Sequence, residues 1–140
     1  MDFPRLQFEQ IGPRRLKVTR TFLYYDKSHK CLLMAPEGFV FDGASVPKLL
    51  RWYADPLDFS LEAACFHDLL TRCRGVLPLG YATPFRRYTR LEADQLFRQI
   101  NQDFGVTWHR VRTGYRGVRL GGWWPWIRGT PGVLRLVPEG

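Results

Sequence analysis

Three short polar runs interrupt otherwise apolar stretches of the chain, and their side chains are of types that perform acid–base, nucleophilic or metal chemistry. Together the runs supply Asp42, Ser45, His67, Asp68, Arg90 and Asp94. Carboxylates and an imidazole can ligate a metal ion or move a proton, and an arginine can hold an anionic substrate. We therefore expect the three runs to meet in one pocket.

One interpretation of these residues is a small hydrolase that depends on a divalent metal ion. The oxygen and nitrogen ligands that suit Mg²⁺ or Mn²⁺ would come from Asp42, His67, Asp68 and Asp94. A bound ion would activate water, or His67 would act as a general base that Asp42 or Asp94 orients. Ser45 lacks the Gly-x-Ser-x-Gly sequence of a nucleophile elbow, which argues against a serine nucleophile.

The other interpretation is a buried polar network that holds the fold together. The predicted helix over residues 61–72 is apolar nearly all round, which is typical of a buried helix. Asp68 falls on an apolar stripe of that helix, so its carboxylate requires a cation, a metal ion or several hydrogen-bond donors. Arg90 is the nearest obvious counter-charge for Asp42 or Asp68. A completed network of this kind specifies a unique core.

The elements that must position these residues begin with a small N-terminal antiparallel sheet. Residues of high β-propensity with partial alternation predict strands over residues 15–25, 31–35 and 39–41. The first two form a hairpin through the polar turn at 26–30, and we interpret His29 in that turn as a surface histidine. Residues 1–14 are expected to form an extended arm.

Capping signals predict where the helices begin. Ser60 is the expected N-cap of the 61–72 helix, and Thr89-x-x-Glu92 is a capping box that opens the next helix. Thr107 can cap a last, weaker helix. Together these elements predict an α+β fold in which the sheet packs against about three helices and a Trp/Gly/Pro-rich tail follows.

At 140 residues the chain is expected to be a single domain, with an arm at 1–14, a core at 15–120 and the tail at 121–140. The three cysteines form no Cys-x-x-Cys pair and have apolar neighbours, which predicts reduced, buried thiols and synthesis in the cytoplasm. We expect no signal peptide, and no apolar segment is long enough to span a membrane.

The net charge of +8 lies entirely in the second half of the chain. Residues 1–70 carry nine basic and nine acidic residues, whereas residues 71–140 carry twelve arginines and four acids. Arginine and tryptophan are enriched at binding hot spots, so we expect this half to dock on a partner. The expected contact residues are Trp123, Trp124, Trp126, Arg116, Arg119 and Arg128. Nucleic acid is a less favoured partner, because no nucleic-acid motif accompanies the charge.

Three motifs occur in order along the middle of the chain. They are Pro36-x-Gly38-Phe39-x-x-Asp42-Gly43-Ala44-Ser45-Val46-Pro47, His67-Asp68-x-Leu70 and Thr89-Arg90-x-Glu92-Ala93-Asp94-x-x-Phe97. This combination resembles a family of phage and prophage proteins known as domain of unknown function 1353, over about Leu33 to Leu120. The chain departs from the family at Leu70-Thr71, near which the family usually has an aromatic residue.

The resemblance implies a phage or prophage origin and supplies no established activity. We favour a structural or accessory protein, most plausibly a component of the virion tail or of its assembly, with the metal-dependent hydrolase as the alternative. The expected partners are other phage structural proteins or a second copy of the chain. Such a protein would be made in the bacterial cytoplasm and could be carried in the virion.

Overall fold

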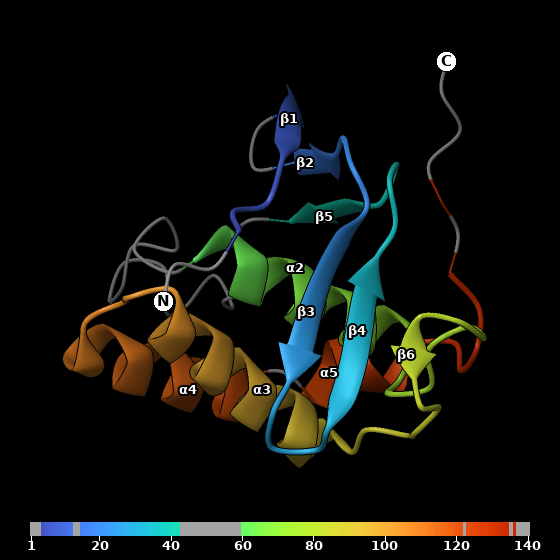
Figure 1. Cartoon of the computed structure of the whole chain (residues 1–140). Helices are drawn as coiled ribbons and strands as arrows, with labels where there is room; N and C mark the ends of the chain where they lie inside the picture. Colours follow the sequence, from blue (N-terminus) through green and yellow to red (C-terminus); the bar gives the residue numbers. More distant parts are fainter. Residues whose placement is uncertain (1–3, 13–14, 43–59, 122, 135, 137–140) are drawn as a thin grey trace.

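The computed structural model describes residues 4–12, 15–42, 60–121, 123–134 and 136, and the side chains of Asp42, Trp123 and Trp124 lie outside this description. Its strands are β1 (Phe8–Gly12), β2 (Arg15–Val18), β3 (Phe22–Asp26), β4 (Cys31–Ala35), β5 (Val40–Asp42) and β6 (Ala82–Thr83). Its helices are α2 (Leu61–Arg72), α3 (Arg90–Asp103), α4 (Trp108–Gly121) and α5 (Trp123–Ile127). The fold is α+β, as predicted (Figure 1).

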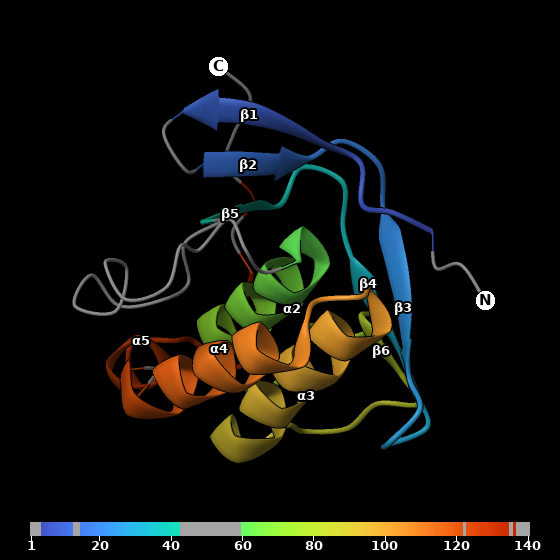
Figure 2. The same cartoon turned by 90° about the vertical axis from the view of Figure 1, so that its left-hand side faces the viewer.

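The strands form two small antiparallel sheets. Sheet A has the order β1-β2-β5, and sheet B has the order β3-β4-β6. In Figure 2 the two sheets meet at a corner, with sheet A over α2 and sheet B along the side of the helices. Because both sheets pack on the same helices, their buried residues belong to one hydrophobic core.

The predicted strand at 15–25 is in fact two strands, and they belong to different sheets. β2 ends at Val18, the chain bends at Arg20, and β3 begins at Phe22. The buried residues keep even-numbered positions on both sides of the bend, as at Val18 and Tyr24. Because the alternation continues across the bend, the sequence did not reveal the corner between β2 and β3. A period of two indicates which face of a sheet a residue occupies but not which sheet its strand joins.

The predicted N-terminal arm also differs, since residues 8–12 form β1 and pair with β2. The residues before β1 are anchored as well. Leu6 is buried, and its backbone N–H donates to Glu62 Oε2 at 2.9 Å. The N-terminal segment therefore covers the start of α2 and contributes to the core.

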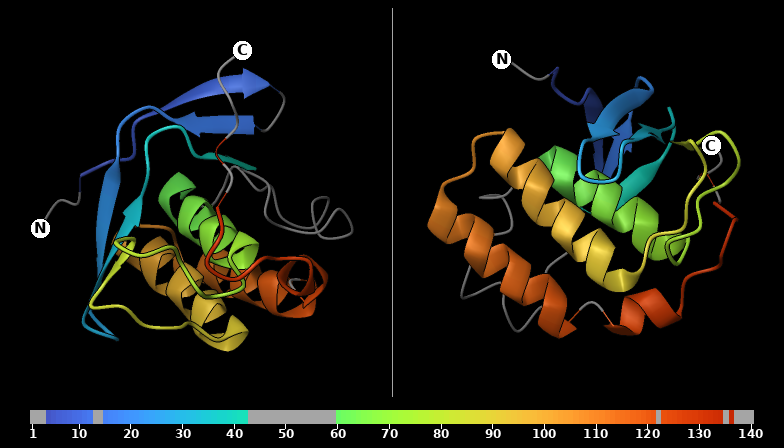
Figure 3. Two further views of the ribbon diagram at one scale, coloured as in Figure 1. Left: turned by 90° about the vertical axis from the view of Figure 1, so that its right-hand side faces the viewer. Right: turned by 60° about the horizontal axis from the view of Figure 1, so that its bottom comes forward.

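The helices begin at the predicted caps. The Ser60 hydroxyl accepts from the N–H of Ala63 at the start of α2, and most residues of α2 are buried. The capping box opens α3, with Thr89 and Glu92 bonding reciprocally. Figure 3 shows α3 lying between α2 and α4, so side chains from all three helices can meet in the two seams.

The segment after α4 folds back onto α2. Trp126 of α5 packs partly buried against the core, and the backbone N–H of Thr130 donates to the carbonyl of Arg72 at 2.8 Å. Gly129 permits this close approach, because a Cβ at that position would lie 2.3 Å from the carbonyl oxygen of Thr71. The return therefore requires a glycine where the segment crosses the end of α2.

Beyond that crossing the chain runs toward sheet A. Leu136 lines a hollow there with Glu9 of β1 and Lys17 of β2.

The three cysteines are buried and free, as predicted. Within the described ranges, no helix is both long and apolar enough to cross a membrane.

Candidate functional site

His67 and Asp94 form a buried pair between α2 and α3. His67 Nε2 lies 2.6 Å from Asp94 Oδ1, and the two side chains are 6% and 1% exposed. The other carboxylate oxygen of Asp94 accepts from Arg119 Nη1 of α4 at 2.9 Å. A buried carboxylate needs such partners, because removing it from water is otherwise strongly unfavourable. The second and third polar runs therefore meet, and the cluster ties three helices together.

The spacing of residues on α3 holds the imidazole in place. The ring of His67 packs edge-on against the ring of Phe97, with centroids 5.3 Å apart. Asp94 and Phe97 are three residues apart and so project from the same side of the helix. Because Nε2 of His67 faces Asp94, only Nδ1 is left to exchange a proton with any other group.

Arg90 binds the C-terminal end of α4 rather than the acid of α2. Its Nη2 donates to the carbonyl of Val118 at 3.2 Å and to the carbonyl of Arg119. The last carbonyls of a helix have no partner within it, and a guanidinium there also complements the helix dipole. The prediction that Arg90 is the counter-charge of Asp68 is therefore wrong.

Asp68 pairs within its own helix. Its Oδ2 lies 3.0 Å from Nη2 of Arg72, and the aspartate and arginine side chains are 18% and 40% exposed. The expectation that Asp68 lies on a buried stripe is wrong, because the side of α2 that carries it opens at a hollow lined also by Pro125 and Arg128. The i, i+4 spacing of Asp68 and Arg72 was the sequence signal for this pair.

The first polar run lies outside the described residues, apart from the backbone of Asp42 at the end of β5. The Asp42 side chain and Ser45 both belong to this undescribed part. Among the described residues, no group of three His, Cys, Asp or Glu side chains is placed to hold a metal ion. The proposed ligation of Mg²⁺ or Mn²⁺ by Asp42, His67, Asp68 and Asp94 stays a prediction.

His29 forms a second cluster that sequence reasoning missed. Its Nδ1 lies 2.7 Å from Asp26 Oδ2, and its Nε2 lies 3.1 Å from Glu92 Oε2. The interpretation of His29 as a surface histidine is wrong, since its side chain is only 25% exposed and bridges the β3–β4 turn to α3. The Tyr88 hydroxyl donates to the same Asp26 oxygen at 2.8 Å, inside the molecule.

Glu92, one of the two acids of this cluster, is held as a carboxylate. Burial opposes the ionisation of Glu92, but the backbone N–H of Thr89 and the guanidinium of Arg86 outweigh it and lower the pKa of Glu92 to about 2. Burial raises the pKa of Tyr88, and its hydrogen bond to Asp26 raises it further, so its hydroxyl keeps its proton. Asp26-x-x-His29 was the only local sequence signal for the cluster, because Glu92 comes from a distant helix.

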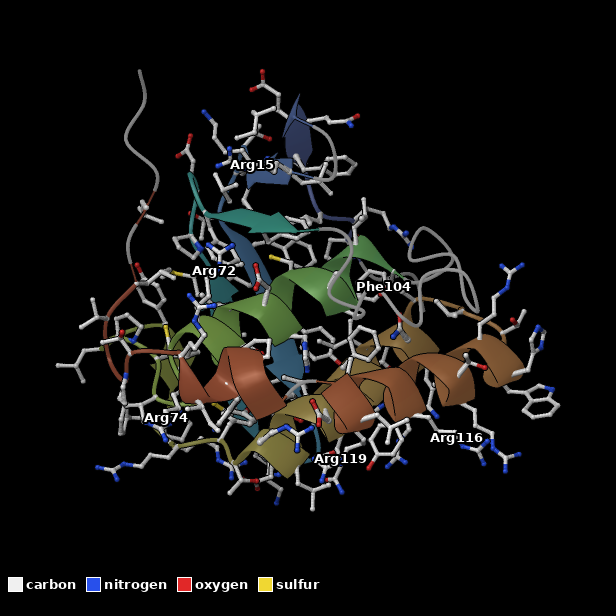
Figure 4. The ribbon with its side chains drawn as sticks, turned by 180° about the vertical axis from the view of Figure 1, so that it is seen from behind. Arg15, Arg72, Arg74, Phe104, Arg116 and Arg119 are labelled. Atoms are coloured by element: carbon white, nitrogen blue, oxygen red, sulfur yellow. The ribbon has the colours of Figure 1, made fainter. Side chains whose placement is uncertain are left out.

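Of the residues expected to contact a partner, some are engaged within the molecule and others are exposed. Trp126 is partly buried against the core, and Arg119 is held by Asp94. Arg128 is exposed beside α2, and Arg116 is exposed on α4, where Figure 4 shows it projecting away from the helix. Trp123 and Trp124 belong to α5, but their side chains lie outside the described residues.

The outer face of α4 is a further feature that the sequence interpretation did not single out. Residues four apart on a helix lie on one side of it, and here that side carries Trp108, Arg112, Arg116 and Leu120. All four are exposed, Trp108 and Leu120 by 74% and 72%. We call these four residues the α4 stripe. The opposite side of α4 packs inward through Val111 and Val118.

Comparison with known proteins gives a family and no described activity. No curated protein and no solved structure matches the chain. A family model matches residues 16–118, and its description is "Protein of unknown function (DUF1353)". Because the match covers more than half of the sequence and includes β2 through most of α4, the chain belongs to the DUF1353 family.

Proposed function

We propose that the protein is a phage- or prophage-encoded structural or accessory protein, a component of the virion tail or of its assembly, that docks on an acidic protein surface through the α4 stripe. The observation that carries this proposal is the exposure of two arginines between two large apolar side chains on one helical face. Trp and Arg supply much of the energy of protein–protein interfaces, where apolar contact surrounds the charged groups.

The charge of α4 supports an acidic partner. Residues 108–121 contain four arginines and no acid. One of the four, Arg119, is neutralised by Asp94 inside the molecule, whereas Arg112 and Arg116 face solvent. A protein partner accounts for Trp108 and Leu120 as well as for the charge, which a purely phosphate-binding surface would not require.

The buried cluster supports the same proposal in a different way. Both carboxylate oxygens of Asp94 are engaged, one by His67 and one by Arg119. Arg90 holds the end of the same helix through two carbonyls. These bonds fix the position of α4 on the core, so the cluster presents the docking face in one orientation.

The test is incorporation into phage particles. In a host carrying the phage or prophage, tail intermediates and mature particles are purified on a density gradient, and the chain is quantified by mass spectrometry. The wild-type chain should sediment with them, and Arg112→Glu with Arg116→Glu should reduce its amount at least tenfold. Arg20→Glu with Arg87→Glu reverses the same charge at exposed sites outside α4 and should leave the amount unchanged.

Three results would overturn the proposal. The first is a wild-type chain that is absent from both intermediates and particles. The second is a melting temperature that rises with millimolar Mn²⁺ and falls again with chelator, which would favour the hydrolase with ligands from Asp42, His67, Asp68 and Asp94. Salt-sensitive binding of duplex DNA that the two glutamates abolish would instead assign α4 to nucleic acid.

A further inference from the structure

The second open surface of the molecule is the edge of sheet B at β3. The sheet has the order β3-β4-β6, so β3 pairs on one side only. In Figure 2, which looks toward this edge, no helix or strand is drawn over β3, and the N-terminal segment passes beside its first residues, where Pro4, Arg5 and Gln7 line a hollow with Phe22 and Leu23. An unpaired edge strand offers a row of backbone N–H and C=O groups to another strand.

The direction of the free backbone groups follows from the pairing of β4. The N–H of Met34 donates to the carbonyl of Tyr81 at 2.9 Å, on the side away from β3. Met34 is opposite Leu23, and Leu32 is opposite Tyr25. In an antiparallel pair the hydrogen-bonded positions alternate, so Leu23 and Tyr25 direct their N–H and C=O groups to the open edge. Among the described residues, these groups have no backbone partner outside the sheet.

The side chains at this edge are apolar. Leu23 and Tyr25 are 52% and 54% exposed on the outer face of the sheet, with Leu32 of β4 beside them at 38%. The one charged residue of β3, Asp26, is fully buried. The exposed residues of β3 itself are therefore uncharged, and the nearest basic residues along the chain are Arg20 before the strand and Lys27 after it.

The β1 edge of sheet A is protected in a way that β3 is not. β1 carries Glu9, and its register with β2 is irregular between Gln10 and Gly12. Charges and bulges are the usual means by which an edge strand avoids pairing with another chain. The residues of β3 include no lysine, proline or bulge.

We infer that β3 pairs with β3 of a second copy of this chain. In the antiparallel register centred on Tyr24, Leu23 of each copy lies opposite Tyr25 of the other, and both residues point their backbone groups at each other. This register makes four backbone hydrogen bonds and joins two sheets B into one six-stranded sheet. A strand that matches itself about a two-fold axis gives a closed dimer, which is why the second copy is the occupant.

The inference does not depend on the α4 stripe, because β3 lies on a different element and neither residue of the edge takes part in the proposed docking. The first measurement is the mass of the full chain by sedimentation equilibrium. The wild-type protein should be a dimer, and Leu23→Lys with Tyr25→Lys should weaken the dimer at least tenfold. Leu79→Lys with Leu91→Lys changes two other exposed apolar residues and should leave the dimer intact.

A second measurement tests the register and does not depend on how well the lysine variant folds. Leu23→Cys and Tyr25→Cys proteins are incubated separately and as a mixture in a glutathione redox buffer. The mixture should form the disulfide-linked dimer much faster than either protein alone, because only residues 23 and 25 of different copies face each other within disulfide distance. A monomeric wild-type chain, or equal cross-linking in all three samples, would overturn the inference.

Discussion

Both histidine clusters pair an imidazole with carboxylates, one between buried helices and the other in a partly exposed hairpin turn. His67 lies between helices, with one carboxylate on one ring nitrogen, and that carboxylate is shared with an arginine. His29 lies in a hairpin turn and has a carboxylate on each ring nitrogen. The first cluster fixes helices against each other, and the second fixes sheet B to the start of α3. One histidine therefore joins α2 to α3, and the other joins sheet B to α3.

The largest expected effect comes from the interior cluster. Asp94→Ala should lower the free energy of unfolding by about 3–5 kcal/mol, because His67 and Arg119 lose their acceptor in a buried site. Urea unfolding followed by circular dichroism measures this change. Asp68→Ala is the comparison, since the Asp68 side chain is 18% exposed against 1% for Asp94, so its substitution should lower the free energy of unfolding by less. Equal effects would remove the distinction between the two acids.

A smaller effect is expected at the hairpin turn. Asp26→Ala should lower the free energy of unfolding by about 2–3 kcal/mol, because the buried hydroxyl of Tyr88 and Nδ1 of His29 lose their acceptor, while Nε2 of His29 keeps Glu92. Glu37→Ala removes an exposed acid near the other end of β4 and should change little. If both substitutions change the unfolding midpoint equally, His29 belongs to an ordinary surface turn after all.

The smallest effect is a change in acid sensitivity. The pKa of Glu92 is about 2 in the folded protein against an ordinary value of 4.5, so its ionised form contributes stability above pH 4.5. This contribution is lost as the pH falls from about 4.5 toward 2. Glu92→Gln should therefore flatten the loss of stability in that window, by about 1 kcal/mol or less for a side chain that water reaches.

Glutamine at residue 92 can still accept from the Thr89 N–H, so the substitution removes the charge and keeps the cap. Thermal unfolding between pH 5 and 2.5 gives the slope for each protein. Glu37→Gln is the control and should follow the wild-type curve. A Glu92→Gln curve parallel to the wild type would mean that the ion pairs with Arg86 and His29 do not form in solution.

Local signals in the sequence predicted the helices well and the strands only in part. Ser60 and Thr89 act at the positions they occupy, because a cap depends on residues within one turn of it. The corner after Val18 depends on which strand pairs with each side of it, β5 with β2 and β4 with β3, and no local pattern records this. β1 pairs with the neighbouring β2, but its residues are almost all exposed and show no alternation of buried and exposed positions. A strand that changes sheet without changing the phase of its buried residues cannot be told from one long strand.

The two histidine clusters also differ in how far local sequence signals revealed them. His67 was conspicuous because a polar residue interrupts an apolar helix, and the cluster does join it to Asp94. His29 was inconspicuous because polar residues are ordinary in a turn, and its second acid is more than sixty residues away. The counter-charge of Asp68 was misassigned because a distant arginine was preferred to Arg72, four residues along the same helix.

The return of the C-terminal segment across α2 has a practical consequence for handling the protein. Leu136 lies beside sheet A, with Glu9 and Lys17 as neighbours, while α4 lies on the other side of the helices (Figures 1 and 2). A fluorophore attached at residue 136 therefore lies on a face that neither proposed contact uses. Labelled protein can report on docking through α4 and on strand pairing at β3 without the label competing for either surface.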